Sequence, residues 1–244
     1  MKEAKQIDKS NEVQSTKEPD ALLGSPNRQK VLRGLLIQRW AAILGILSFG
    51  VLYLFLSDLL ILPFIPRWLP LLLEGILILP FVYGLVTHRR LSQRLIRTFG
   101  FLLAGVATLA LVGSITLLLI SLPHRQASQS ITLVRDAAIL WISNILVFGL
   151  WYWELDGGGP LKRHKAGHKA IDFMFPQQIN GNEEGWAPHF IDYVFLAFNT
   201  ATAFSPTDTA PLSRPAKVLM MIESIISLVI VAGIAARAIN ILGG

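Results

Sequence analysis

Hydroxyl and carboxylate side chains follow one another in a short polar stretch between two apolar segments near the end of the chain. Three threonines and a serine alternate there with small, aromatic and proline residues, and an aspartate closes the stretch. Such oxygen atoms, together with backbone carbonyls, can replace the water around a cation in a membrane pore. The stretch is therefore predicted to line a polar constriction for cations. Its candidate residues are Thr200, Thr202, Phe204, Ser205, Pro206, Thr207 and Asp208.

Polar side chains inside apolar segments form a second group of candidates. Glu74 and Glu223 each interrupt such a segment, and an acid within a membrane is a functional candidate because burying its charge is costly. The structural alternatives for Glu223 are an ion pair with Lys217 or with Arg237 of a neighbouring chain, or a hydrogen-bonded packing contact. Glu74 lies near a segment end and is expected to anchor its helix. Asn144 is expected to hydrogen-bond to a neighbouring helix.

Two histidines have the spacing that could hold a metal on a helix. His164 and His168 are four residues apart, which places their rings on one helical face. Arg163 and Lys165 crowd the pair with positive charge, and no third ligand stands at a fixed spacing. We therefore expect a solvated basic loop here, with no metal and no cofactor.

Motifs of enzymes are missing from the sequence. There is no nucleophile elbow, no zinc-protease motif, no phosphate-binding loop and no dinucleotide fingerprint. The chain has no cysteine, which excludes thiolate chemistry. The sequence predicts that the protein is not an enzyme.

The elements that must position these residues are apolar helices. The chain is 52% hydrophobic and 16% charged, whereas soluble chains average roughly 45–50% apolar and about 25% charged. Five runs approach the length of about 20 residues that a membrane-spanning helix needs. The composition thus predicts an all-α polytopic membrane protein. The five runs are residues 41–62, 71–86, 99–122, 137–153 and 218–242.

A sixth apolar run, residues 189–204, is too short for an ordinary span. At 1.5 Å per residue it would reach about 24 Å, short of the roughly 30 Å hydrocarbon core. The polar stretch and then the last run follow it, with Ser213 placed to cap the last helix. This order is typical of a re-entrant element. Re-entry and a thin or tilted sixth crossing both remain open.

The basic residues predict how the chain is oriented. Three groups of four lysines and arginines flank the runs: before the first, between the second and third, and after the fourth. The alternate loops hold only Arg67, Arg125 and Arg135. The positive-inside rule then places the N-terminus and the loop after the fourth run in the cytoplasm. The net charge of +6 is explained by topology, so a nucleic-acid partner is not expected.

These observations divide the chain into four parts. Residues 1–33 are polar and are expected to form a flexible cytoplasmic tail. Residues 34–153 form a four-helix transmembrane region, residues 154–188 a polar connector, and residues 189–244 a helix–loop–helix module. The predicted architecture is five transmembrane helices plus one short membrane-embedded helix, in the inner (plasma) membrane.

The helix–loop–helix module resembles the pore module of potassium channels. Thr200 and Thr202 fall on the first two threonines of the channel signature T-x-T-T-x-G-Y-G-D, and Asp208 falls on its aspartate. The chain departs from the signature at Ala203 and at residues 205–207, where Ser-Pro-Thr replaces Gly-Tyr-Gly. The resemblance implies a pore in a homo-oligomer, and the missing glycines imply weak cation selectivity.

Three strings also resemble a family of uncharacterised bacterial integral membrane proteins. They are WYWELDGGGP at residues 151–160, DFMFPQ at 172–177 and FSPTDTAPLS at 204–213. This resemblance implies a membrane location and no particular activity.

The leading interpretation is a channel-like membrane protein that conducts monovalent cations with weak selectivity as a homo-oligomer in the lipid bilayer. A non-conducting structural or assembly protein is the alternative, and a membrane enzyme is the third. One conflict stands within the leading interpretation. Channel pore helices enter from outside, whereas the basic residues place the connector at 154–188 in the cytoplasm.

Overall fold

The protein is mostly helical. The computed structural model describes residues 43–45, 47–61, 65–86, 93–124, 130–181, 186–202 and 208–242, and the segment Ala41–Gly244 forms one compact unit. Its longer helices are α4 (Leu69–Val86), α5 (Gln93–Ser121), α6 (Ser130–Leu155), α8 (Phe190–Thr202) and α9 (Arg214–Leu242), preceded by the apolar helical segment Ile43–Leu54. Its short elements are η1 (Asp58–Leu60), η2 (Leu122–His124), η4 (Asp156–Gly158), α7 (Pro160–Lys165), β1 (Phe173–Met174), η5 (Pro176–Gln178) and β2 (Ala210–Pro211).

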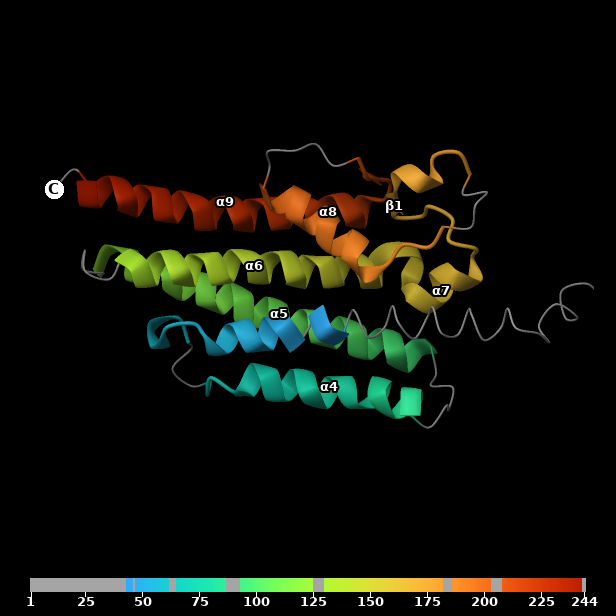
Figure 1. Ribbon diagram of the computed structural model, residues 1–244, viewed down its shortest axis with the longest axis horizontal. Coiled ribbons are helices and arrows are strands. Elements are labelled where there is room, and N and C mark those ends of the chain that lie inside the picture. Colours follow the sequence, from blue (N-terminus) through green and yellow to red (C-terminus); the bar gives the residue numbers. More distant parts are fainter. Residues whose placement is uncertain are drawn as a thin grey trace, which may run out of the picture. The chain divides into compact units, whose positions relative to one another are not determined.

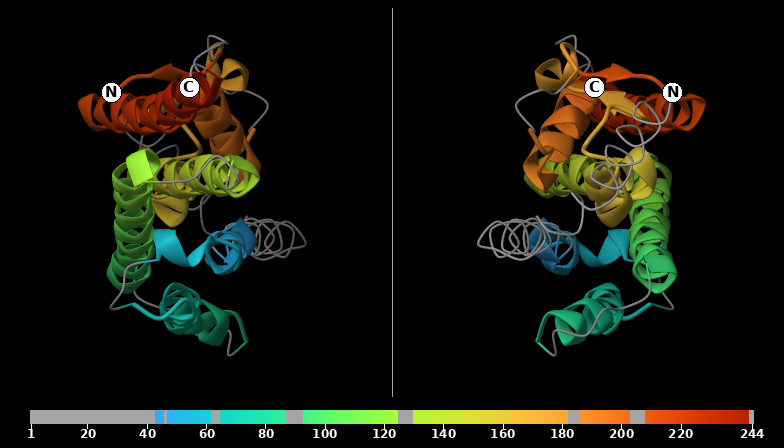
Figure 2. Two further views of the ribbon diagram at one scale, coloured as in Figure 1. Left: turned by 90° about the vertical axis from the view of Figure 1, so that its left-hand side faces the viewer. Right: turned by 90° about the vertical axis from the view of Figure 1, so that its right-hand side faces the viewer.

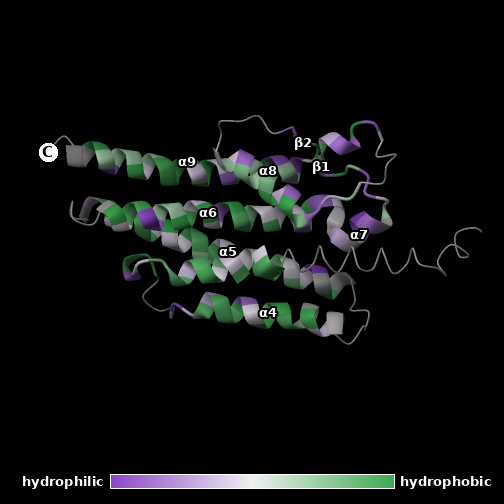
Figure 3. Ribbon diagram, viewed as in Figure 1, coloured by the Kyte–Doolittle hydropathy of each residue, from purple (hydrophilic) through white to green (hydrophobic). Residues whose placement is uncertain are grey.

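The long helices of this unit lie side by side. α9 packs on α6, α6 on α5, and α5 on α4, so that α4 and α9 form opposite edges (Figures 1 and 2). The short helix α8 packs mainly on α6 and also on α9. Green, apolar residues run along α4, α5, α6 and α9, whereas α7 and the strand region carry more purple, polar residues (Figure 3).

Three described helices are long and apolar enough to cross a membrane. They cover Arg97–Ser121, Ile131–Gly158 and Arg214–Ile239. The apolar helices Ile43–Leu54 and Leu69–Leu79 are shorter. The predicted all-α class is confirmed. All five predicted runs contain helix, but only three meet the length of a full span.

Polar contacts accompany two of the differences in helix length, one buried and one exposed. α6 begins well before the predicted run because Asp136 is drawn into the interior, where it accepts hydrogen bonds from Ser57 N (3.2 Å) and Ser57 Oγ (2.6 Å). The first helix is shorter than its predicted run because the chain turns after Leu54. Asp58, beyond that turn, pairs with Arg67.

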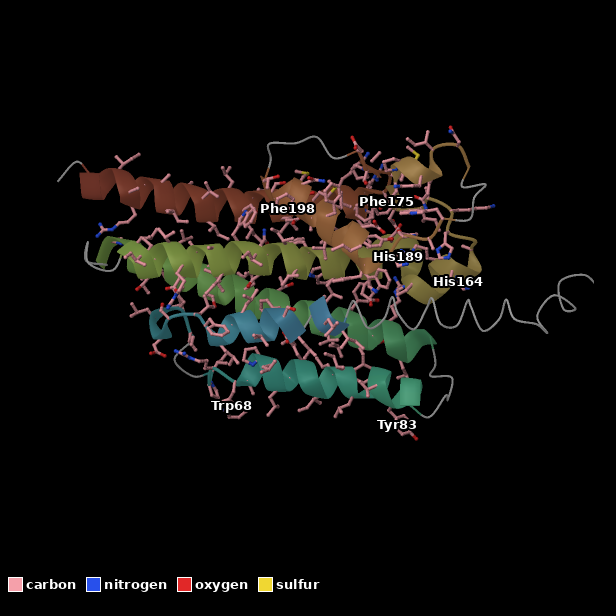
Figure 4. The ribbon with its side chains drawn as sticks, in the orientation of Figure 1. Trp68, Tyr83, His164, Phe175, His189 and Phe198 are labelled. Atoms are coloured by element: carbon pink, nitrogen blue, oxygen red, sulfur yellow. The ribbon has the colours of Figure 1, made fainter. Side chains whose placement is uncertain are left out.

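The helix ends identify two faces of the bundle. α4 ends, α5 begins, α6 ends and α9 begins at the end where α7 and the strands lie (Figure 1). In Figure 4, Tyr83, His164 and His189 lie toward this end and Trp68 lies toward the other. We call it the connector end. It carries the start of α5 and the basic segment around α7, as the predicted orientation requires.

Candidate functional site

The short helix α8 begins at the connector end and runs back along α6. Tyr193, in its first turn, donates a hydrogen bond to Asp156, which follows the last turn of α6. Farther along α8, the ring of Phe198 contacts that of Trp141, in the first half of α6, with a centroid distance of 5.9 Å. Figure 4 shows Phe198 displaced from His189 toward the opposite end. α8 is thus antiparallel to α6 and points into the bundle.

The chain returns to the connector end after α8. β2 pairs antiparallel with β1, with Phe173 opposite Pro211 and Met174 opposite Ala210. Leu212 N also donates to Asp172 O over 2.8 Å. Asp156, which accepts the hydrogen bond from Tyr193 at the start of α8, also accepts hydrogen bonds from the backbone beside β1. The start of α8 and the segment after it are therefore both attached to the connector end. The described residues before α8 and those at β2 thus lie at the same end of the bundle.

The far end of α8 lies rather more than a third of the way along the last helix. Ser224 Oγ donates to the carbonyl oxygen of Thr200 over 3.3 Å. Ser224 is separated from Arg214, the first residue of α9, by about 15 Å of helix at 1.5 Å per residue. The last turn of α8 therefore lies beside the first half of α9, well inside the bundle.

The last turn of α8 concentrates oxygen atoms. The final four carbonyls of a helix have no partner farther along it, and the helix dipole places partial negative charge there. Ser224 satisfies the carbonyl of Thr200, and Thr202 Oγ1 donates to Asn199 O over 3.1 Å. Thr200 Oγ1 donates to Leu196 O over 2.9 Å. This end of the helix favours a cation over an anion.

The predicted pore residues are only partly covered by the described structure. Thr200 is buried and Thr202 half-buried in the last turn of α8, whereas Asp208 is exposed just before β2. Phe204, Ser205, Pro206 and Thr207 lie outside the described residues.

Glu223 lies in a polar cluster between α6, α8 and α9. Its side chain is fully buried, and Oε2 accepts a hydrogen bond from the hydroxyl of Tyr152. Tyr152 also has Thr200 as a hydrogen-bonding neighbour. Within the described part of this chain, Glu223 makes a hydrogen-bonded packing contact with a neutral group, and an ion pair with Arg237 of a neighbouring chain is not tested by a single chain.

Asn144 joins this cluster from α6. Its amide nitrogen donates to the carbonyl oxygen of Glu223 over 3.3 Å and to Ser227 Oγ over 3.0 Å. All three residues are almost completely buried. The predicted interhelical role of Asn144 is confirmed. We call Asn144, Tyr152, Glu223 and Ser227 the buried polar cluster.

Glu74 belongs to a separate contact. It is fully buried in α4, and its carboxyl lies against Gly50 of the first helix. A Cβ atom added at Gly50 would come within 2.3 Å of Glu74 Oε2. We expected Glu74 to anchor the end of its helix, whereas in the structure it makes a tight contact between α4 and the first helix. The structure does not bring Glu74 to the other candidates.

A buried ion pair fixes the connector to the start of α8. Arg163 is only 2% exposed, and its guanidinium lies 3.7 Å from Asp156 Oδ2. The same group donates to Asp156 O over 2.8 Å. It also stacks over the rings of Trp153 and Tyr193, at 4.9 and 5.1 Å from their centroids. The sequence predicted a solvated basic loop here, whereas Arg163 is buried and holds α6, α7 and α8 together.

The two histidines of the connector touch each other. His164 Nδ1 and His168 Nε2 are 3.0 Å apart. His168 has a left-handed backbone with φ of 55°, and Gln178 Nε2 donates to its carbonyl oxygen over 2.7 Å. Partial burial, and then the positive charge of His164, Arg163 and His189, lowers the pKa of His168 to about 4. Among the described residues, no three His, Asp or Glu side chains gather to hold a metal.

Sequence reasoning missed Tyr152, Asp156 and Arg163. Tyr152 reads as one member of an interfacial aromatic belt, and nothing in its neighbours reveals which face of α6 it occupies. Asp156 and Arg163 are seven residues apart across a Gly-Gly-Gly turn. Positive φ angles at all three glycines, 61°, 77° and 98°, fold that turn back. The glycine run was the available signal for such a turn.

Comparisons of the chain with protein families, with curated proteins and with solved structures find no match.

Proposed function

We propose that this protein is a multi-pass protein of the inner (plasma) membrane whose α8–loop–α9 module forms a weakly selective pathway for monovalent cations in a homo-oligomer. The observation that carries the proposal is the course of α8. It begins at the connector end, stops beside Ser224 of α9, and is followed by a segment that pairs with β1 at the connector end. A short helix and a returning loop at membrane depth require a protein or water-filled lining.

The electrostatics of α8 support a cation rather than an anion as the permeant species. The carbonyl end of the helix, with its partial negative charge, points to the middle of the bundle. Thr202 lies in the final turn, and Asp208 is exposed where the chain emerges. In an oligomer, these groups and the loop residues Phe204 to Thr207 would form rings of oxygen atoms around an axis.

The proposed topology has five crossings and one re-entrant helix. In it, the two shorter apolar helices cross as the first and second spans, at the cost of modest bilayer thinning. The basic groups at the start of α5 and around α7 then face the cytoplasm together with the N-terminus. α8 enters from the cytoplasmic face in this arrangement. The conflict between the basic connector and an extracellular entry is thereby removed.

The surface of α9 supports partners in the bilayer. Apolar side chains on this helix are exposed, among them Met221, Ile225 and Leu228 at 63%, 58% and 68%. Such a face is suited to lipid or to other copies of the chain. An oligomer is required for an axial pore, so a monomer in native-like lipid would contradict the proposal.

The test is cation flux into vesicles that contain the purified chain. We expect potassium or sodium flux from the wild type and a severalfold smaller flux from Thr202→Ala and from Asp208→Ala. Thr116→Ala is the matched control, since its hydroxyl is exposed on α5 and bonds to Val112 O of the same helix. Absent flux, or equal flux in all variants, would overturn conduction and favour the non-conducting structural or assembly protein.

A further inference from the structure

We propose that the carboxyl of Glu223 is a proton-binding site in the buried polar cluster, and that it holds its proton at neutral pH. The proposal stands on the packing between α6 and α9 and does not depend on conduction.

If Glu223 were ionised, its surroundings would leave the negative charge of the carboxylate without compensation. The residue is fully buried. Oε2 accepts one hydrogen bond, from the neutral hydroxyl of Tyr152, and Oε1 meets no hydrogen-bond partner among the described residues. A buried ionised carboxylate is stable only when it is paired or bound to a cation. A proton is the cation that needs the least space.

The elements packed around Glu223 supply no positive group within the described part of the chain. α6 contributes Tyr152, which is the titratable neighbour, and the neutral Asn144. α8 contributes Thr200, which is held by Ser224. The next turn of α9 contributes Ser227. Neutralisation must therefore come from a bound proton or a bound metal cation.

The donors and acceptors of the buried polar cluster favour a bound proton over a bound metal cation. Asn144 uses its amide nitrogen on Glu223 O and Ser227 Oγ, whereas its Oδ1 is buried and meets no donor in the described structure. The cluster therefore has an excess of acceptors, which includes Glu223 Oε1. Protonation converts one acceptor into a donor. Each buried polar atom that gains a partner stabilises the fold.

Proton occupancy would be transmitted to the proposed pore helix. Ser224 is the sequence neighbour of Glu223 and donates to Thr200 O at the end of α8. Loss of the proton would place a charge beside this contact and draw water or a cation into the cluster. The same site would then sense pH at mid-depth in the bundle.

Infrared spectroscopy of the full chain in lipid vesicles tests the proposal. We expect the C=O stretching band of a protonated carboxyl at neutral pH, and the loss of its Glu223 component in Glu223→Gln. Glu74→Gln separately identifies the buried carboxyl of α4. Asp192→Asn is the control, because that carboxylate accepts a hydrogen bond from His189 N at the start of α8 and is not fully buried. It should leave the band unchanged.

A second variant keeps the test decisive should Glu223→Gln not fold. In Tyr152→Phe the carboxyl loses its hydroxyl donor, so its band should remain and move to higher wavenumber. A spectrum unchanged by Glu223→Gln or by Tyr152→Phe would overturn the proposal. So would a band that appears only after sodium and potassium are replaced by a bulky organic cation, because a metal cation would then be the occupant.

Discussion

The side-chain hydroxyl of Ser224 donates a hydrogen bond to the carbonyl oxygen of Thr200 over 3.3 Å. Thr200 lies in the last turn of α8, where carbonyls have no partner in their own helix. Ser224 lies in the first half of α9 and next to the buried Glu223. One contact therefore joins the end of α8 to the last long helix and to the buried polar cluster.

Ser224→Ala removes this contact. We expect it to lower the free energy of unfolding by about 1 kcal/mol, because one hydrogen bond is lost and a partly buried carbonyl is left without its donor. Cation flux should fall as well. Chemical unfolding in detergent followed by circular dichroism measures the stability. Thr116→Ala is the control. Equal stability of the two variants would contradict a role for Ser224 in holding α8.

Gly149→Ala tests the close approach of α6 and α8. An added Cβ would lie 3.1 Å from Val194 Cγ2 and 3.2 Å from Val194 Cα, which is backbone. We expect a loss of about 1–3 kcal/mol from overpacking. Gly105→Ala in α5 is the matched control, since no heavy atom lies within 4 Å of its added Cβ. Thermal unfolding should show that variant unchanged or more stable by about 0.5–1 kcal/mol.

The helices themselves could be predicted from the sequence because each long apolar run is bounded by prolines or polar residues. Asn144 could be predicted as a contact between helices because an amide within an apolar run needs a partner. Ser213 could be predicted as a cap, and its Oγ indeed accepts a hydrogen bond from Ala216 N over 3.3 Å. These features are local, so spacing and residue type suffice.

The contacts that build the site are not local. Tyr152 and Glu223 are separated by 71 residues, and which faces of α6 and α9 meet depends on packing across the whole bundle. The proposed re-entry of α8 depends on the pairing of β1 with β2, two strands of two residues each. Strands this short carry no periodic signal. The sequence therefore left re-entry and crossing undecided.

Arg163→Met tests the buried ion pair of the connector. Asp156 would lose its cation in a buried place, although Tyr193 still donates to it. Breaking one partner of a buried pair typically costs about 3–5 kcal/mol. Lys162→Met, at the neighbouring exposed position, is the control and should change thermal stability little. A small effect of Arg163→Met would show that the connector does not depend on this pair.

The lowered pKa of His168 predicts how the stability of the protein depends on pH. Its pKa in the folded protein is about 4, below the ordinary 6.5, so the unfolded chain binds more protons between these values. Stability should therefore be full above about pH 6.5 and decline as the pH falls toward 4. His168→Asn, which tolerates the left-handed backbone, should flatten this decline in chemical unfolding at pH 7 and pH 4.5. Lys169→Asn should leave the decline intact.

The re-entry of α8 is the central claim, and cysteine accessibility tests it most directly. The chain has no native cysteine, so single cysteines at Lys169, Asp208 and Gly244 can each be labelled with a membrane-impermeant maleimide in oriented vesicles. Lys169 and Asp208 are exposed on either side of α8 in the sequence, and α9 runs to Leu242. We predict labelling of Lys169→Cys and Asp208→Cys from one face and of Gly244→Cys from the other. Labelling of Asp208→Cys from the face opposite to Lys169→Cys would show that α8 crosses the membrane and would contradict the account.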